Sequence, residues 1–230
     1  MELIWDGLRE AVEALARGDD VLYSTAARSL YVSGLATLIS LALGVLAGSF
    51  LALQRFRGRG LALAFVNTGM GLRPVVVGLV VAVLLWRSGP LGDLHLIYTV
   101  WAMVLAHAVL TFPIVTGFTA AALAAQPPEL RLQLLGLGAS RWQALWLLLK
   151  EARLPVLAAV MAAFGAAVSE VGASMMVGGN IAGETRVLTT AVVLETSRGE
   201  FAPAIALSIV LLVLVFVVNL VLTGVQLRGR

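Results

Sequence analysis

Five long apolar runs dominate this sequence and decide the environment in which it folds. They cover roughly residues 29–54, 61–86, 96–125, 154–178 and 201–227. Each run is longer than the ~20 residues that a helix needs to cross a ~30 Å hydrocarbon core. Only 13% of the residues are charged, whereas about a quarter is usual in soluble domains. The pattern predicts an all-α membrane protein with about five transmembrane helices.

Basic residues gather on one side of such a five-span arrangement. The connection 55–60, the segment 127–153 and the C-terminus together hold nine Lys or Arg residues, against the two acids Glu129 and Glu151. Lys and Arg concentrate on the cytoplasmic side of membrane proteins. We therefore expect the N-terminus outside and the C-terminus in the cytoplasm.

The whole chain, 1–230, is expected to form one membrane domain. Residues 1–28 carry apolar side chains at helical spacing opposite charged ones, which favours an amphipathic helix in the membrane interface over a short helix packed on the domain. Three spans are expected within 29–126, followed by a cytoplasmic loop at 127–153. Two more spans are expected within 154–227, with an external loop at 179–200.

Several kinds of chemistry are excluded by residues that the chain lacks. It has no cysteine and two histidines, which removes disulfides, thiolate nucleophiles, iron–sulfur clusters and Cys-rich zinc sites. Lys150 is the single lysine and follows Leu149, so a phosphate-binding loop of the GxxxxGK[ST] type is impossible. We expect no catalytic residue, no metal site and no cofactor in this chain. Its basic residues form no patch suited to nucleic acid.

The segment 127–153 is too long for a turn and too polar for a span. Two prolines followed by Glu129 favour a helix start, and Gly136 and Gly138 permit a break. A second helix with Trp142 and Trp146 on one face follows. The pattern predicts a cytoplasmic docking hairpin, and a hairpin that only anchors the spans is the alternative.

Two spans contain residues that a lipid-facing helix does not need. The second is interrupted at 69–74 by glycines and a proline, with Arg73 among them; a broken helix at membrane depth needs protein or a water-filled cavity beside it. The fourth carries a stripe of small residues and then Glu170, an intramembrane acid that needs a partner. We expect Arg73 and Glu170 to pair across the bundle. The alternative is that Arg73 extends to an interface. The stripe consists of Ala158, Ala162, Ala166, Ser169 and Ala173.

The stretch 178–197 differs most from the apolar remainder. It combines glycines, hydroxyls, an amide and spaced charges, and the topology places it at the external mouth of the fourth span. It is expected to form part of an outer gate and receiving surface.

Two parts of the chain resemble one family of membrane proteins. Residues 137–142, Leu-Gly-Ala-Ser-Arg-Trp, match the centre of the EAA loop of type I ATP-binding-cassette (ABC) importers, although the E-A-A positions hold Leu132, Gln133 and Leu134. The distal pieces are similar to the tungstate branch of the molybdate, tungstate and sulfate permeases. These pieces are 169–173, 175–181, 185–186, 188–191 and 194–197.

This resemblance implies a permease subunit of an ATP-driven importer that moves a tetrahedral oxyanion, tungstate, by alternating access. A homodimer is implied because five spans enclose no path alone. The implied partners are two cytoplasmic ATPase subunits, which bind ATP and Mg²⁺, an external binding protein, and the lipid of a bacterial or archaeal cell (inner) membrane. For ATPase coupling the expected residues are Glu129, Gly136, Gly138, Ala139, Ser140 and Arg141.

Two further sets of residues are expected to serve transport. Hydroxyl, amide and backbone donors can pass an anion without trapping it, and charges outside suit a binding protein, although a solvated loop is the alternative for them. The expected pathway and gate residues are Arg73, Ser169, Glu170, Ser174, Gly178, Gly179 and Asn180. The expected binding-protein contacts are Glu184, Arg186, Glu195 and Arg198.

Other functions remain open from the residues alone. The same machinery carrying molybdate, sulfate or another anion is the nearest alternative. An intramembrane hydrolase using a serine and His107 is more remote, because the chain lacks a GxSxG motif and an evident third member. A purely structural membrane protein is the other remote alternative. His107 is expected to be a hydrogen-bonded packing residue.

Overall fold

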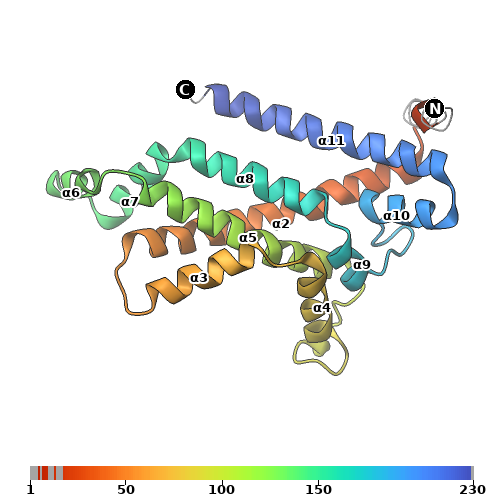
Figure 1. Cartoon of the computed structure of the whole chain (residues 1–230), viewed down its shortest axis with the longest axis horizontal. Helices are drawn as coiled ribbons and strands as arrows, with labels where there is room; N and C mark the ends of the chain where they lie inside the picture. The colour runs from red at the N-terminus through yellow and green to blue at the C-terminus, as the bar shows by residue number, and fades with distance from the viewer. Residues whose placement is uncertain (1–4, 6, 10–12, 14–17, 229–230) are drawn as a thin grey trace.

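The computed structural model describes residues 5, 7–9, 13 and 18–228, and within these residues the chain is helical, with no strand. The long helices lie side by side along one axis, and α4 turns away from it (Figure 1). The elements are α2 (Asp20–Leu53), α3 (Arg59–Met70), α4 (Pro74–Leu85), the 3₁₀ turn η1 (Gly92–Leu94), α5 (Val100–Ala124), α6 (Pro128–Gly136), α7 (Arg141–Glu151), α8 (Arg153–Val168), α9 (Gly172–Gly178), α10 (Leu188–Arg198) and α11 (Phe201–Arg228).

Helices α2 and α5 form the centre of the bundle and pack through small residues. A Cβ atom added at Gly44 would lie 2.8 Å from Val115 Cβ, and one added at Gly48 would lie 2.6 Å from the Thr116 carbonyl oxygen. Ser40, buried in the same interface, hydrogen bonds through its hydroxyl to Thr111 Oγ1 at 2.7 Å. Small residues let helix backbones approach closely in membranes, where no hydrophobic force drives two apolar helices together. Glycines that allow close contact and hydroxyl groups that hydrogen bond across the interface therefore hold α2 and α5 together.

The membrane-spanning segments agree with the predicted class and count. Within the described residues, three helices are long and apolar enough to cross a membrane: Asp20–Leu53, Val100–Ala124 and Phe201–Leu227. Two bent pairs bring the number to as many as five, α3 with α4 at 104° and α8 with α9 at 59°. The prediction of an all-α membrane protein with about five spans is confirmed, when each bent pair is counted as one span.

The first span begins earlier than expected. Asp19 caps α2 by accepting hydrogen bonds from the Val21 and Leu22 amides at 2.9 and 3.4 Å, so the helix starts at Asp20 rather than at 29. Its 34 residues extend about 51 Å at 1.5 Å per residue. Residues 20–28, assigned to the interfacial helix, therefore belong to this span. Most of the remaining part of that predicted helix lies outside the described residues.

The chain passes back and forth between two ends of the bundle. Leu53 and Leu123, at the ends of α2 and α5, belong to one cluster with Leu148 and Ala152. At the other end, Leu22 packs with the start of α10 and with α11. The start of α2 and the end of α11 lie at opposite ends of the molecule (Figure 1), as an odd number of crossings requires. We call the end with Leu53 and Leu123 the hairpin end, because it carries α6 and α7. The end with Leu22 is called the α10 end.

Candidate functional site

The break between α8 and α9 holds Glu170, the buried acid among the residues that the structure describes. Helix α8 ends at Val168, and Glu170 lies in the bend with only 8% of its surface exposed. Its Oε1 atom accepts a hydrogen bond from the Ala173 amide at 2.9 Å, at the start of α9. A carboxylate at a helix start meets free N–H groups. The partner expected for this intramembrane acid is therefore the backbone of α9. Glu170 lies just before a helix rather than inside one.

The expected ion pair between Arg73 and Glu170 is not formed. Arg9 pairs with Glu13 and Arg198 pairs with Glu195, but Arg73 and Glu170 do not pair with each other. Arg73 is exposed at the start of α4, whereas the Glu170 carboxylate turns onto its own backbone. The correction has a physical reason, because a helix start offers an acid hydrogen bonds within three residues and requires no charge from another span.

The two breaks nevertheless lie against each other. A Cβ atom added at Gly172 would lie 2.7 Å from Val75 Cγ2 and 3.5 Å from Glu170 Oε1. One added at Gly78 would lie 2.6 Å from the Ala173 Cα atom. The glycines let α4 pack directly on α9, so that the bend carrying Arg73 and the bend carrying Glu170 form one corner of the molecule.

The small-residue stripe on α8 faces away from the core of its own chain. Ala159, Ala163 and Ala167 are the buried alanines of this helix, while the predicted stripe precedes them by one residue and lies about 100° around the helix. Its members on α8 and in the following bend are exposed, and only Ala173 is buried; the exposed members are Ala158, Ala162, Ala166 and Ser169. We call these four residues the α8 face. Ser169, at its end, donates its hydroxyl hydrogen to the Gly165 carbonyl at 2.6 Å.

His107 and Ser174 join α5 to α9 inside the core. Nε2 of His107 lies 2.8 Å from Ser174 Oγ, and the two residues are 2% and 0% exposed. His107 is thus the hydrogen-bonded packing residue that was expected. Ser174 was predicted to be a donor in the pathway, but its hydroxyl bonds inside the protein in this conformation.

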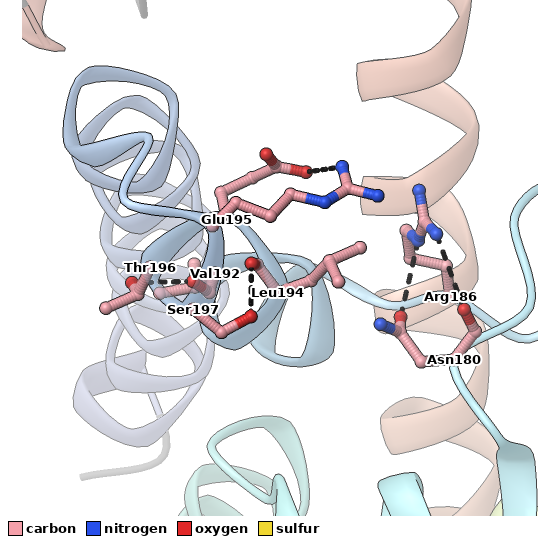
Figure 2. A network of polar contacts seen from close by, with 8 residues as sticks. Asn180, Arg186, Val192, Leu194, Glu195, Thr196 and Ser197 are labelled. Atoms are coloured by element: carbon pink, nitrogen blue, oxygen red, sulfur yellow. Dashed lines mark hydrogen bonds and ion pairs between the residues drawn. The ribbon is translucent and has the colours of Figure 1, made fainter.

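The other predicted donors close the turns that follow α9. The Gly178 carbonyl accepts a hydrogen bond from Thr185 Oγ1 at 2.5 Å, and the Gly179 amide donates to Met175 O at 3.1 Å. Asn180 has a positive φ of 52° and accepts a bond from Arg186 Nε at 3.3 Å (Figure 2). These groups are engaged by Thr185, Met175 and Arg186, so they form no open cage for a ligand.

This segment is also tied to the first span. Arg28 donates to the carbonyls of Gly183 and Arg186 at 2.6 and 2.8 Å, and the Leu188 amide donates to Ser29 Oγ at 2.8 Å. The sequence reading missed this function for Arg28 and Ser29. The signal was present, because hydroxyls recur every four residues or so along an apolar span, at Thr25, Ser29, Ser33 and Thr37.

Tyr98 is a second residue that the sequence reading missed. Its φ of 62° is left-handed, which is uncommon for a bulky residue. Its amide donates to Val177 O at 2.8 Å, and its ring would meet any Cβ atom at Gly179, at 2.8 Å. The loop before α5 thereby fixes the end of α9.

The residues predicted to contact a binding protein all lie at the α10 end. Glu184 and Arg198 are exposed, and Arg186 is half-buried. Glu195 pairs with Arg198 Nη1 at 3.2 Å (Figure 2), while Arg186 supports Asn180. The set therefore divides into exposed charges and charges that hold the turn.

The predicted docking hairpin has the expected shape. Helix α6 begins at Pro128 with Glu129 in its first turn, and Gly138 is left-handed, with φ +87°. Ser140 caps α7 in a reciprocal arrangement with Gln143, as capping boxes do. The hairpin projects beyond the ends of α2 and α5 (Figure 1).

The tip of the hairpin is open to a partner. Leu137 is 86% exposed, and Gly136, Ser140 and Arg141 are exposed as well, while Ala139 is half-buried. The role of the six expected coupling residues stays a prediction. No group of three or more potential metal ligands occurs within the described part of the chain.

Known membrane transport proteins share the sequence of this chain over most of its length. The family model for the binding-protein-dependent transport system inner membrane component matches residues 41–228. The tungstate uptake system permease protein TupB of Peptoclostridium acidaminophilum is 39% identical over 98% of this chain and 99% of its own length. A probable anion ABC transporter permease protein of Haloferax volcanii is 39% identical over 91% of each chain.

A solved structure supports the fold independently. The methionine ABC transporter MetNI, in an inward-facing conformation, has a chain that superposes with a TM-score of 0.74, covering 91% of this chain and 96% of its own, at 16% identity. The bent spans, the projecting hairpin and the family match agree: this chain belongs to the binding-protein-dependent transport system inner membrane components, the permease subunits of ABC importers.

Proposed function

We propose that this chain is the permease of an ATP-driven tungstate importer, working as a homodimer with two ATPase subunits and an external binding protein. The observation that carries the proposal is the 39% identity to a tungstate uptake permease across 98% of the chain. The chain itself supplies the path and the docking surfaces, while the partner ATPases bind ATP and Mg²⁺.

The α8 face supports a homodimer with the path on its two-fold axis. Ala158, Ala162 and Ala166 are exposed, and alanines permit close contact between helices. In a two-fold dimer the same face of each chain meets its copy. Ser169 then lies where the two breaks approach the axis.

The charge distribution along this face suits a dianion in transit. Glu170 turns its carboxylate inward onto α9, so the α8 face bears no fixed negative charge. Arg73 is exposed at the adjoining break and attracts an anion without enclosing it. A path that conducts needs sites weak enough to release the ion. The inward orientation of the Glu170 carboxylate therefore suits the passage of an anion better than the ion pair first expected.

The two ends of the bundle suit the two kinds of partner. The hairpin end carries most of the basic residues and belongs in the cytoplasm by the positive-inside rule, which places the N-terminus outside. The ATPase subunits would seat on the hairpin, and their closure would rotate the two permeases as rigid bodies. The binding protein would meet the α10 end, where Glu184 and Arg198 are exposed.

Transport by the reconstituted complex tests the proposal. Proteoliposomes containing this chain and its ATPase subunits are loaded with ATP, and the binding protein is added outside with labelled tungstate. We expect uptake that requires both ATP and the binding protein and that excess sulfate does not suppress. Uptake of sulfate or molybdate in preference to tungstate would overturn the substrate, and failure to form a complex with an ATPase would overturn the class.

A further inference from the structure

An apolar pocket with arginines at its rim lies at the hairpin end, between α2, α6 and α7. Its volume is about 510 Å³. We call it the arginine pocket. The residues that matter here are Leu46, Ser49, Phe50, Arg131, Arg141 and Trp142.

One wall of the pocket continues the lipid-facing surface of a span. Leu46 and Phe50 are 54% and 55% exposed on the last turns of α2, and α2 is apolar enough to cross the membrane. Trp142 of α7, 74% exposed, faces the same pocket. Tryptophan is enriched where membrane meets water. The pocket therefore opens at the depth where acyl chains end and headgroups begin.

The rim of the pocket is positively charged. Arg131 and Arg141 line it, and no acidic residue does so among the described residues. Arg131 donates from Nη1 to the Leu53 carbonyl at 2.6 Å, which fixes the guanidinium at the rim and uses one of its five N–H groups. The field at this rim favours an anion.

A buried hydroxyl in the same pocket has no partner. Ser49 Oγ is buried and makes no hydrogen bond in the structure, although buried polar groups are normally satisfied. Two other hydroxyls of α2, those of Thr37 and Ser40, donate to backbone carbonyl oxygens. The lining of the pocket therefore includes an unsatisfied hydroxyl group.

We propose that the arginine pocket binds an anionic phospholipid of the cytoplasmic leaflet. Its acyl chain lies along Leu46, Phe50 and Trp142, and its phosphate meets Arg131 and Arg141. Basic pockets on the cytoplasmic side bind anionic headgroups, and guanidinium groups match phosphate oxygens in geometry. The lipid joins α2 to the hairpin on which the ATPase subunits would dock. A zwitterionic lipid lacks the net charge that the rim selects.

Quenching of tryptophan fluorescence by brominated lipid tests this proposal. The complex of this chain with its ATPase subunits is placed in nanodiscs that contain either brominated phosphatidylglycerol or brominated phosphatidylcholine. We expect stronger quenching by phosphatidylglycerol. That excess should disappear in Trp142→Phe and remain in Trp146→Phe. Trp146 is a matched control because it is 62% exposed on the same helix, stacks with Lys150 and does not line the pocket.

Charge variants test the rim. We expect Arg131→Gln and Arg141→Gln each to raise the phosphatidylglycerol content needed for half-maximal quenching roughly fivefold, as one surface arginine does. Arg57→Gln removes the same charge from the same side, outside the pocket, and should leave that content unchanged. Arg131→Gln keeps an amide donor for Leu53, and Arg141→Gln changes an exposed residue, so at least one variant stays folded.

Three results would overturn the proposal. The first is equal quenching by the two lipids, and the second is an excess that survives in Trp142→Phe or in both arginine variants. The third is a Trp142 that neither lipid quenches in the complex, which would assign the pocket to the ATPase subunit instead.

Discussion

Thr185 holds together the turns that follow α9. Its Oγ1 atom donates to the Gly178 carbonyl at 2.5 Å and accepts from the Ile181 amide at 2.9 Å, and the residue is 1% exposed. One hydroxyl therefore satisfies two backbone groups that no helix can reach. The turn that presents Asn180 and Glu184 at the α10 end depends on this side chain.

Replacing Thr185 by valine should loosen that turn. Valine keeps the shape but removes the partner of the buried Gly178 carbonyl and of the Ile181 amide, at a cost of about 1–3 kcal/mol. We expect a lower thermal unfolding temperature of the purified protein in detergent and weaker stimulation of ATP hydrolysis by the binding protein. Thr196→Val is the control, because Thr196 is exposed and bonds only to Val192 within α10. Equal stability of the two variants would contradict this account.

Glu170 shows where single residues escape sequence reasoning. An acid in an apolar run signals that it has a partner, and the sequence offered Arg73. The partner is instead the Ala173 amide, because the helix breaks at Val168 and a new helix starts four residues later, at Gly172. The position of that break decides whether Glu170 meets Arg73 or the Ala173 amide. No Pro or Asn marks the break in the sequence, and Gly172 is its local signal.

Among the elements, α2 depends most on the size of its residues. Gly48 and Gly34 lie in the same helix, but a Cβ atom at Gly48 would lie 2.6 Å from Thr116 O, whereas one at Gly34 would have no neighbour within 4 Å. A substitution at Gly48 therefore tests close packing between helices, whereas one at Gly34 tests helix propensity alone. Gly48 permits α5 to approach, and Gly34 only costs helix stability.

Alanine at the two positions should act in opposite directions. Gly48→Ala overpacks the α2–α5 interface and should destabilise the protein by roughly 1–3 kcal/mol. Gly34→Ala should stabilise it by up to about 1 kcal/mol through helix propensity. Thermal unfolding of the two variants in the same detergent measures both. The central pairing of α2 with α5 would be wrong if the Gly48→Ala variant were more stable than the unchanged protein.

The elements were predictable where the pattern was long and local. Runs of apolar residues predicted the spans, and Pro128, Gly136 and Gly138 predicted the hairpin. The 104° bend between α3 and α4 was predictable as a break, from Gly69 to Pro74, but not as an angle. The angle comes from packing of α4 on α9, where Gly78 meets Ala173, and such long-range contacts leave no periodic signal.

At the scale of the whole molecule, the α8 face should meet its copy. The chain contains no cysteine, so single cysteines at Ala158, Ala162 and Ala166 can be oxidised in membranes without a background from this chain. We expect at least one to form a disulfide-linked dimer, because only positions on a two-fold axis bring identical residues together. Leu212→Cys, on a side chain 69% exposed on α11, should stay monomeric under the same oxidation. A dimer from Leu212→Cys alone would place the interface elsewhere.

Blocking the end of the α8 face tests the central claim most directly. Ser169→Cys and Leu212→Cys proteoliposomes, containing the partner ATPase subunits, are assayed for ATP-dependent tungstate uptake before and after reaction with a bulky maleimide. The account predicts that labelling abolishes uptake by the Ser169→Cys complex and leaves uptake by the Leu212→Cys complex at its value before labelling. Undiminished uptake after complete labelling at Ser169 would contradict a path along this face.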